Sequence, residues 1–145
     1  MDNLDLKVMV REVARAHGID VLMMSDFGHA AHVQWNLFSV DRAAPLAHQA
    51  TDAELYEALR QAREGQRSDV FRFIERLCGV DFATDTFKTW VDGHGEQPTS
   101  SLPQAGSTAM ASGGIGGKEL ALRVLGHLRS GRIVYDLLDR TVVSR

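Results

Sequence analysis

The first third of the chain has hydrophobic positions that recur at helical spacing. Residues 3–17 predict a helix, because apolar residues three and four positions apart share one face. That predicted apolar face consists of Leu6, Met9, Val10, Val13 and Ala14. Asn3 can cap the first turn, since its side-chain oxygen can accept a backbone N–H there. Gly18 stands where a helix commonly ends in a left-handed residue.

Two strands are predicted after this helix. Residues 19–24 are mostly apolar and fit a short buried strand, and residues 25–28 can turn the chain. The following residues alternate between polar and apolar side chains: His32, Val33, Gln34, Trp35, Asn36 and Leu37. A period of two predicts a strand with one buried face and one wetter face. Helix, buried strand, turn and alternating strand is an α/β order in which we expect the second pair to be antiparallel.

Helices dominate the prediction for residues 41–104. Residues 52–64 and 68–77 predict two helices, and residues 84–91 predict a third, shorter one. Residues 92–103 are rich in Gly, Ser, Thr and Pro and therefore predict a loop. We interpret the whole stretch as a helical insertion that ends in a crossover loop.

A long helix is predicted from about residue 105 to 129. Small residues recur at every fourth position along it: Ala105, Ala109, Gly113, Gly117 and Ala121. Residues four apart share a helix face, so this stripe predicts close packing against a neighbouring backbone. Such packing would compensate for the roughly 1 kcal/mol that each helical glycine costs. Residues 133–138 and 141–143 then predict two closing strands joined by a turn at residues 139–140.

Composition narrows the class of protein. The 145 residues are 44% apolar and 24% charged, which is typical of a globular domain. A net charge of −3 gives no indication of a nucleic-acid partner. The sequence shows no apolar run near the ~20 residues of a membrane span and no signal-peptide pattern. The single cysteine, Cys78, cannot form an internal disulfide. We therefore expect a cytoplasmic protein that does not bind membranes.

The order of these elements resembles the C-terminal half of the ThiF and MoeB adenylyltransferases, bacterial relatives of the ubiquitin-activating enzymes. Asp2-Asn3, followed four residues later by Lys7, resembles the family's Asp-Asn-x-x-x-Arg element. Residues 11–23 resemble the helix and apolar strand that follow it. Residues 101–107, with the glycine-rich stretch 113–117, resemble the entry to the family's long helix.

The turn at residues 25–28 is similar to the Ser-Asp-x-Gly turn of a ThiF-like subgroup associated with nitroreductase-like domains. The resemblance implies an α/β fold: the C-terminal half of a ThiF/MoeB Rossmann-like domain, with a mixed sheet, helices and a helical insertion. Residues 1–145 would form a single partial domain, with residues 41–104 as the insertion and crossover. The N-terminal half that carries the Gly-rich ATP loop would be absent.

The resemblance also implies a reaction, in which Mg-ATP activates a carboxylate as an acyl-adenylate. The substrate would be the C-terminus of a ubiquitin-like or sulfur-carrier protein, and the enzyme a homodimer. Asp2 corresponds to the family's magnesium ligand, and Asn3 and Lys7 to residues that shape the nucleotide site. Lysine in place of arginine loses bidentate phosphate contact and leaves a point charge. We expect the 145 residues alone to be nearly inactive, and a non-catalytic dimerisation or partner-binding module is the alternative.

Asp2 and Cys78 each have a second interpretation. Asp2 can simply be a helix-start carboxylate that favours the positive end of the helix dipole. Cys78 is a candidate thiol acceptor for the activated carboxylate, but it follows Leu77 at a predicted helix end and also fits a small apolar core position. One cysteine cannot supply the paired Cys-x-x-Cys elements of the family's zinc site, so no zinc site is expected.

Three other patterns are better explained by structural roles than by catalysis or ligand binding. Asp26, His29 and His32 have a metal-like composition, but the sequence offers no further ligand at helical or hairpin spacing. The glycines of residues 113–117 lack the Lys-Ser/Thr pair of a phosphate loop, and close helix packing is the preferred interpretation. Asp136 and Asp139 flank a predicted turn, where aspartate is common.

Overall fold

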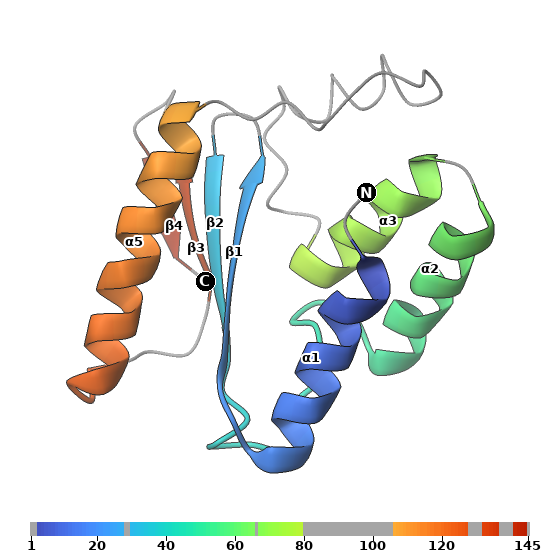
Figure 1. Ribbon diagram of the computed structural model, residues 1–145, viewed down its shortest axis with the longest axis horizontal. Coiled ribbons are helices and arrows are strands. Elements are labelled where there is room, and N and C mark those ends of the chain that lie inside the picture. Colours follow the sequence, from blue (N-terminus) through green and yellow to red (C-terminus); the bar gives the residue numbers. More distant parts are fainter. Residues whose placement is uncertain are drawn as a thin grey trace. The chain divides into compact units, whose positions relative to one another are not determined.

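The computed structural model describes residues 3–27, 30–65, 67–79, 106–127, 132–136 and 141–144. Residue contacts divide these elements into two compact units. The first unit holds α1 (Leu4–His17), α2 (Asp52–Glu64) and α3 (Arg67–Cys78) with the segment that precedes α2. The second holds most of β1 (Val21–Phe27) and β2 (Ala30–Asn36), together with α5 (Gly106–Val124), β3 (Arg132–Asp136) and β4 (Thr141–Ser144) (Figure 1).

Both predicted ends of α1 are confirmed. The side-chain oxygen of Asn3 accepts the backbone N–H of Leu6 at 3.2 Å, so Asn3 caps the helix. Gly18 ends it in the left-handed region, with φ 65° and ψ 37°. The following residue, Ile19, donates its N–H to the carbonyl of Ala14 at 2.8 Å. This closure satisfies carbonyls that the last helical turn leaves without partners.

The predicted apolar face of α1 is wrong for all but one residue. Leu6, Met9, Val10 and Val13 are each about half exposed, and only Ala14 of that set is buried. The buried positions are Val8, Arg11 and Ala14. The periodicity correctly groups residues that share a face. It does not say which face of the helix meets the rest of the unit.

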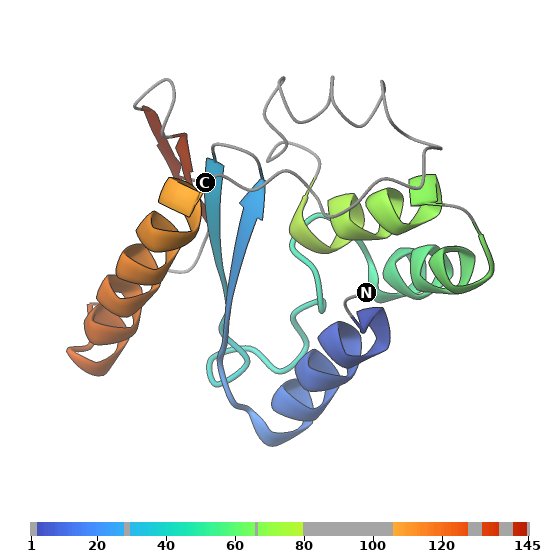
Figure 2. The ribbon, with the colours of Figure 1, turned by 45° about the horizontal axis from the view of Figure 1, so that its top comes forward.

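Helices α2 and α3 form a packed pair in the first unit, and they lie side by side in both views (Figure 2). The bounds of α2 match the prediction, and those of α3 match it within one residue. Thr51 and Glu54 make a capping box at the start of α2, with Thr51 N–H to Glu54 at 2.8 Å and Glu54 N–H to Thr51 at 3.3 Å. The backbone and side-chain hydrogen bonds from Thr51 lower the pKa of Glu54.

Buried side chains at helical spacing supply the core between these helices. On α2 the buried residues are Leu55, Ala58, Leu59 and Ala62. Phe73 and Leu77 of α3 are buried one turn apart, and Phe38 and Leu46 are fully buried in the segment before α2. Asp52 ties that segment to α1, because one carboxylate oxygen accepts from Arg15 at 2.6 Å and the other accepts from the Leu46 N–H at 2.9 Å.

The strands of the second unit form one sheet in the order β1-β2-β3-β4. Strands β2 and β3 pair antiparallel, with Gln34 opposite Arg132, and β3 and β4 pair antiparallel, with Ile133 opposite Ser144. Neighbouring β1 and β2 are only two residues apart in sequence and must therefore also run antiparallel. The resemblance implies a mixed sheet, whereas neighbouring strands among those that the structure describes run antiparallel.

Two local predictions about β1 and β2 are wrong. Residues 25–27, predicted to turn the chain, continue strand β1. Every residue of β2 is buried, so the polar side chains His32, Gln34 and Asn36 do not form a wetter face. Strand β2 has a neighbour on each side in the sheet, and its burial pattern shows that both of its faces are covered. Alternation identifies the two faces of a strand but not what covers them.

The predicted long helix begins at the expected place and ends earlier. Helix α5 stops at Val124, and Gly126 then adopts a left-handed φ of 75°. His127 donates its N–H to the carbonyl of Leu122 at 2.9 Å, which completes the helix end.

The small-residue stripe of α5 does not pack as predicted. Ala109, Gly113, Gly117 and Ala121 are exposed, and Ala105 lies outside the described residues. A Cβ atom added at Gly113 or Gly117 would have nothing within 4 Å. Gly116 is the buried glycine, and a Cβ there would collide with the side chain of Met24 on β1. The close approach between helix and sheet therefore occurs one position away from the predicted stripe.

The final strand predictions are confirmed for β3 and β4, which begin within one residue of the expected positions. The expected helix at residues 84–91, the loop at 92–103 and the turn at 139–140 lie outside the described residues. Among the helices that the structure describes, none is long and apolar enough to span a bilayer.

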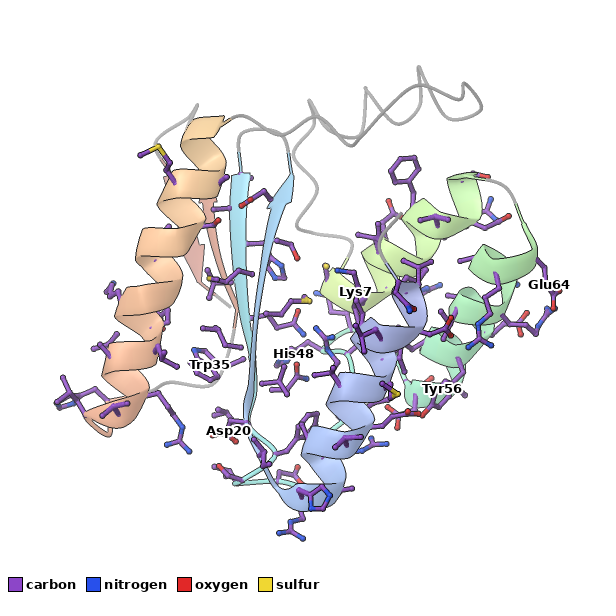
Figure 3. All side chains as sticks on the ribbon, in the orientation of Figure 1. Lys7, Asp20, Trp35, His48, Tyr56 and Glu64 are labelled. Carbon is purple, nitrogen blue, oxygen red and sulfur yellow. The ribbon has the colours of Figure 1, made fainter. Side chains whose placement is uncertain are left out.

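Tyr56 on α2 donates its hydroxyl proton to Glu12 on α1 at 2.5 Å (Figure 3). That hydrogen bond, with smaller contributions from burial, raises the pKa of Tyr56 from 10.0 to about 12. Because folding raises this pKa, the stabilisation is present below about pH 10 and is lost as pH rises through about 12.

We expect Glu12→Gln to move the Tyr56 titration midpoint down toward 10. The ultraviolet absorbance of tyrosinate measures it in a Tyr135→Phe background, which removes the second of the two tyrosines. An unchanged midpoint in the Glu12→Gln variant would show that Glu12 does not hold the phenol proton.

Candidate functional site

The residues that the sequence assigns to nucleotide binding belong to the first turns of α1. Asp2, the predicted magnesium ligand, lies outside the described residues. Asn3 acts as the helix cap, and its side-chain oxygen is occupied by the N–H of Leu6. Lys7 follows one turn later and is half-buried (Figure 3). Lys7 is therefore the one described residue of this set whose side chain can supply a positive charge.

Arg11 is a second cation on the same helix, and it is not among the site residues predicted from the sequence. It lies four residues after Lys7 and is 3% exposed. Its guanidinium donates to the backbone carbonyl of Lys7 at 2.6 Å. Residues four apart share a helix face, so Lys7 and Arg11 follow one another along that face. Arg11 lies three residues from Val8 and three from Ala14, and this spacing on the buried face is the sequence signal that could have identified it.

Cys78, the candidate thiol acceptor, is the last residue of α3, is not part of a disulfide and is 4% exposed. Burial lowers the pKa of the Arg11 guanidinium, and an electrostatic interaction with Cys78 partly opposes that effect. Arg11 stays protonated, because a guanidinium does not lose its proton in proteins.

The first unit therefore brings together three residues from two helices: Lys7, Arg11 and Cys78. Lys7 is half-buried and can neutralise an anion at the start of α1, whereas Arg11 is enclosed and donates to the Lys7 carbonyl. The thiol can accept an acyl group in principle. Cys78 is enclosed in the structure, however, and an activated carboxylate has no direct access to it. Its burial agrees with the interpretation of Cys78 as a small core residue.

A second group of polar residues lies on β2, in the second unit. His32 and Gln34 are both fully buried and, being two residues apart, point to the same face of the strand. Neither the nitrogen nor the oxygen of the Gln34 carboxamide has a hydrogen-bond partner in the part of the chain that the structure describes. The alternating pattern predicts both residues on a wetter face, and neither was a predicted site residue.

The remaining candidates are placed as follows. No group of three metal-ligating side chains occurs among the described residues, and His29 lies outside them. Residues 113–117 lie inside helix α5, so these glycines do not form a loop that could cradle phosphate. Asp136 ends β3 opposite Thr141, and Asp139 lies outside the described residues.

No protein-family model matches the sequence, and no curated protein matches it. The structure is similar to a crystal structure of selenomethionine PaaA, with a TM-score of 0.46 and 11% sequence identity. The similarity covers 94% of this chain and 38% of the PaaA chain, so this chain spans well under half of the PaaA length.

Proposed function

We propose that this chain is the C-terminal part of a ThiF-type adenylyltransferase that activates a carboxylate with Mg-ATP. The substrate carboxylate is the C-terminus of a ubiquitin-like or sulfur-carrier protein. In the reaction, a carboxylate oxygen attacks the α-phosphorus of ATP. The bond from that phosphorus to the oxygen bridging to the β-phosphate breaks, and pyrophosphate leaves. The products are an acyl-adenylate and pyrophosphate.

The observation that carries the proposal is the arrangement at the start of α1. Asn3 fixes the first turn by capping it, and Lys7 and Arg11 then follow at four-residue spacing on one face. Arg11 is buried and holds the Lys7 carbonyl, so it positions the turn from which Lys7 projects. In the resemblance to the adenylyltransferases, Lys7 occupies the position at which arginine is usual.

Lys7 would act by neutralising negative charge on the ATP phosphates. Charge stabilisation of this kind supplies much of the rate enhancement in phosphoryl-group chemistry. A magnesium ion would complete the charge balance, with Asp2 as its oxygen ligand. The other phosphate contacts of the family belong to a Gly-rich half that these 145 residues do not contain, so we expect that half to be required for turnover.

The proposal is tested by ATP–pyrophosphate exchange with the native protein purified from its source cells. Lys7→Ala is expected to lower kcat/KM for ATP about tenfold, because one phosphate charge contact is lost. Lys7→Arg should retain or raise activity, since arginine can contact phosphate bidentately. Lys118→Ala removes an exposed lysine on α5 and is the matched control, with no expected change.

Two outcomes would contradict the proposal. Absence of exchange by the native protein would remove the adenylyltransferase assignment. Equal kcat/KM for Lys7→Ala and the wild type would remove Lys7 from the nucleotide site. In either case circular dichroism shows whether the variants are folded.

A second candidate function is a dimerisation or partner-binding module, which exposed apolar side chains favour. Leu6, Met9, Val10 and Val13 are about half exposed on α1. On and just after α5 the large exposed apolar residues are Met110, Leu120, Val124 and Leu125. Contiguous exposed apolar surface is a common mark of interaction sites. Sedimentation analysis distinguishes the two functions: a tight dimer that does not bind ATP favours the module.

A further inference from the structure

Helices α1 and α2 of the first unit are joined by a polar ladder of three side-chain contacts. The ladder consists of Arg15 with Asp52 at 2.6 Å, Glu12 with Tyr56 at 2.5 Å, and Asp5 with Arg63. Positions 15, 12 and 5 descend along α1 while their partners at 52, 56 and 63 ascend along α2, so the two helices run antiparallel. Residues three, four or seven apart share a helix face. The ladder therefore occupies one face of each helix.

Apolar burial contributes less to the attachment of α1 than to the packing of α3. The buried residues of α1 are Val8, Arg11 and Ala14, and most of its larger apolar side chains are about half exposed. Helix α3 instead buries Phe71, Phe73 and Leu77. The hydrophobic contribution to stability follows the apolar area removed from water. Helix α1 is therefore the more weakly held of the two.

Two features of α1 oppose its closed position or fail to secure it. Desolvation lowers the pKa of the buried Arg11 guanidinium, so the closed position keeps a cation out of water at a cost. The side chains of Asp5 and Arg63 are about half exposed, and exposed ion pairs contribute little and weaken with salt. Segments with few buried apolar contacts open at a lower free energy than the core.

We propose that the polar ladder is a salt-sensitive latch, which lets α1 detach from α2 while the pair of α2 and α3 stays folded. Lys7 lies on α1 between ladder positions 5 and 12, so the latch determines when the Lys7 charge is in place. This consequence rests on the proposed function, in which Lys7 contacts the ATP phosphates. A ligand that binds only the closed state stabilises that state, so bound nucleotide should keep α1 attached.

The first test is amide hydrogen exchange of the protein, followed by mass spectrometry at two salt concentrations. Raising NaCl from about 0.05 M to about 1 M should speed exchange in residues 4–17 about fivefold, because salt screens the ladder contacts. Exchange in residues 67–78, which form α3, should not change and is the internal control. Equal exchange rates for α1 and α3 at both salt concentrations would overturn the inference, because the two helices would then open together.

The second test removes ladder contacts one helix position at a time. Tyr56→Phe combined with Arg63→Gln should speed exchange in residues 4–17 about tenfold and reduce the effect of salt on it. Arg63→Gln alone replaces an exposed side chain and should give about a threefold increase, which keeps the test usable if the double variant does not fold.

Arg60→Gln is the matched control for these variants. Arg60 pairs with Glu57 and Glu64 on α2 itself, so its replacement leaves all three ladder contacts intact. If the ladder variants exchanged residues 4–17 no faster than Arg60→Gln does, the ladder would not be what holds α1.

Mg-ATP separates this inference from the proposed function, in the native protein purified from its source cells. At about ten times its Kd, Mg-ATP should slow exchange in residues 4–17 about tenfold. Ladder-dependent exchange that Mg-ATP does not slow would remove Lys7 from the nucleotide site and leave the latch. Slowing by Mg-ATP without any effect of the ladder variants would remove the latch and leave the proposed function.

Discussion

Replacing Phe73 by alanine is expected to lower the free energy of unfolding by about 3–5 kcal/mol. Phe73 lies on α3 and is fully buried in the unit that also contains α1 and α2. Truncation removes a large apolar side chain from the core and leaves a cavity that its neighbours fill only in part. A loss of this size corresponds to a fall in Tm of about 10–15 °C, measured by calorimetry or circular dichroism.

Val40→Ala is the control for this prediction. Val40 is 79% exposed, so its truncation should change the free energy of unfolding by less than about 0.5 kcal/mol. If Phe73→Ala lowered the free energy of unfolding no more than Val40→Ala does, the packing of α3 against α2 would have to differ from the structure.

The double substitution Gly113→Ala with Gly117→Ala is expected to stabilise the chain by about 2 kcal/mol. Both glycines lie inside α5 and are exposed. An added Cβ would meet no atom within 4 Å at either position. Alanine therefore gains about 1 kcal/mol of helix propensity at each site without a steric cost. Chemical denaturation at constant m-value measures the gain.

Gly116→Ala is the matched control on the same helix. Gly116 is buried, and its added Cβ would collide with the Met24 side chain. Met24 is flexible and 45% exposed, so it can move aside, but its displacement should offset the gain in helix propensity. If Gly116→Ala stabilised the chain as much as alanine does at each of the two exposed positions, that result would contradict the close contact between α5 and β1.

The same glycine variants also test the interaction-module alternative. If a second copy packs closely on the face that contains Gly113 and Gly117, the two added methyl groups should weaken the dimer while stabilising the monomer. Sedimentation at several concentrations separates these effects. An unchanged dimerisation constant would place any dimer interface elsewhere on the molecule.

Interactions between residues near in sequence were determined by the sequence itself. The cap at Asn3, the left-handed Gly18 and the start of α2 all depend on hydrogen bonds or backbone angles within a few residues. These preferences act before any tertiary contact forms. The bounds of α1 and α2 were therefore predictable, as were the approximate positions of the other described helices and the closing strands.

The choice of buried face was decided by the tertiary structure. The periodicity of α1 groups Leu6, Met9, Val10 and Val13 correctly, yet that group is exposed and Arg11 is buried instead. On α5, the regular stripe of small residues faces open space, and Gly116 makes the close approach. A period specifies which residues lie together on an element, but the free energy of burial depends on the surface that the element meets.

The same distinction applies to the candidate site residues: some were predictable from the sequence, and others were recognised only in the folded structure. The resemblance to adenylyltransferases selected Lys7 and Cys78 from the sequence alone, and it selected neither Arg11 nor Gln34. The positions of these two became informative only when burial showed a guanidinium enclosed beside Cys78 and a carboxamide without hydrogen-bond partners in the described part of β2. Sequence records which polar groups a chain contains. Only the folded arrangement determines which of them lose contact with water, and burial without a partner is what makes a polar group costly.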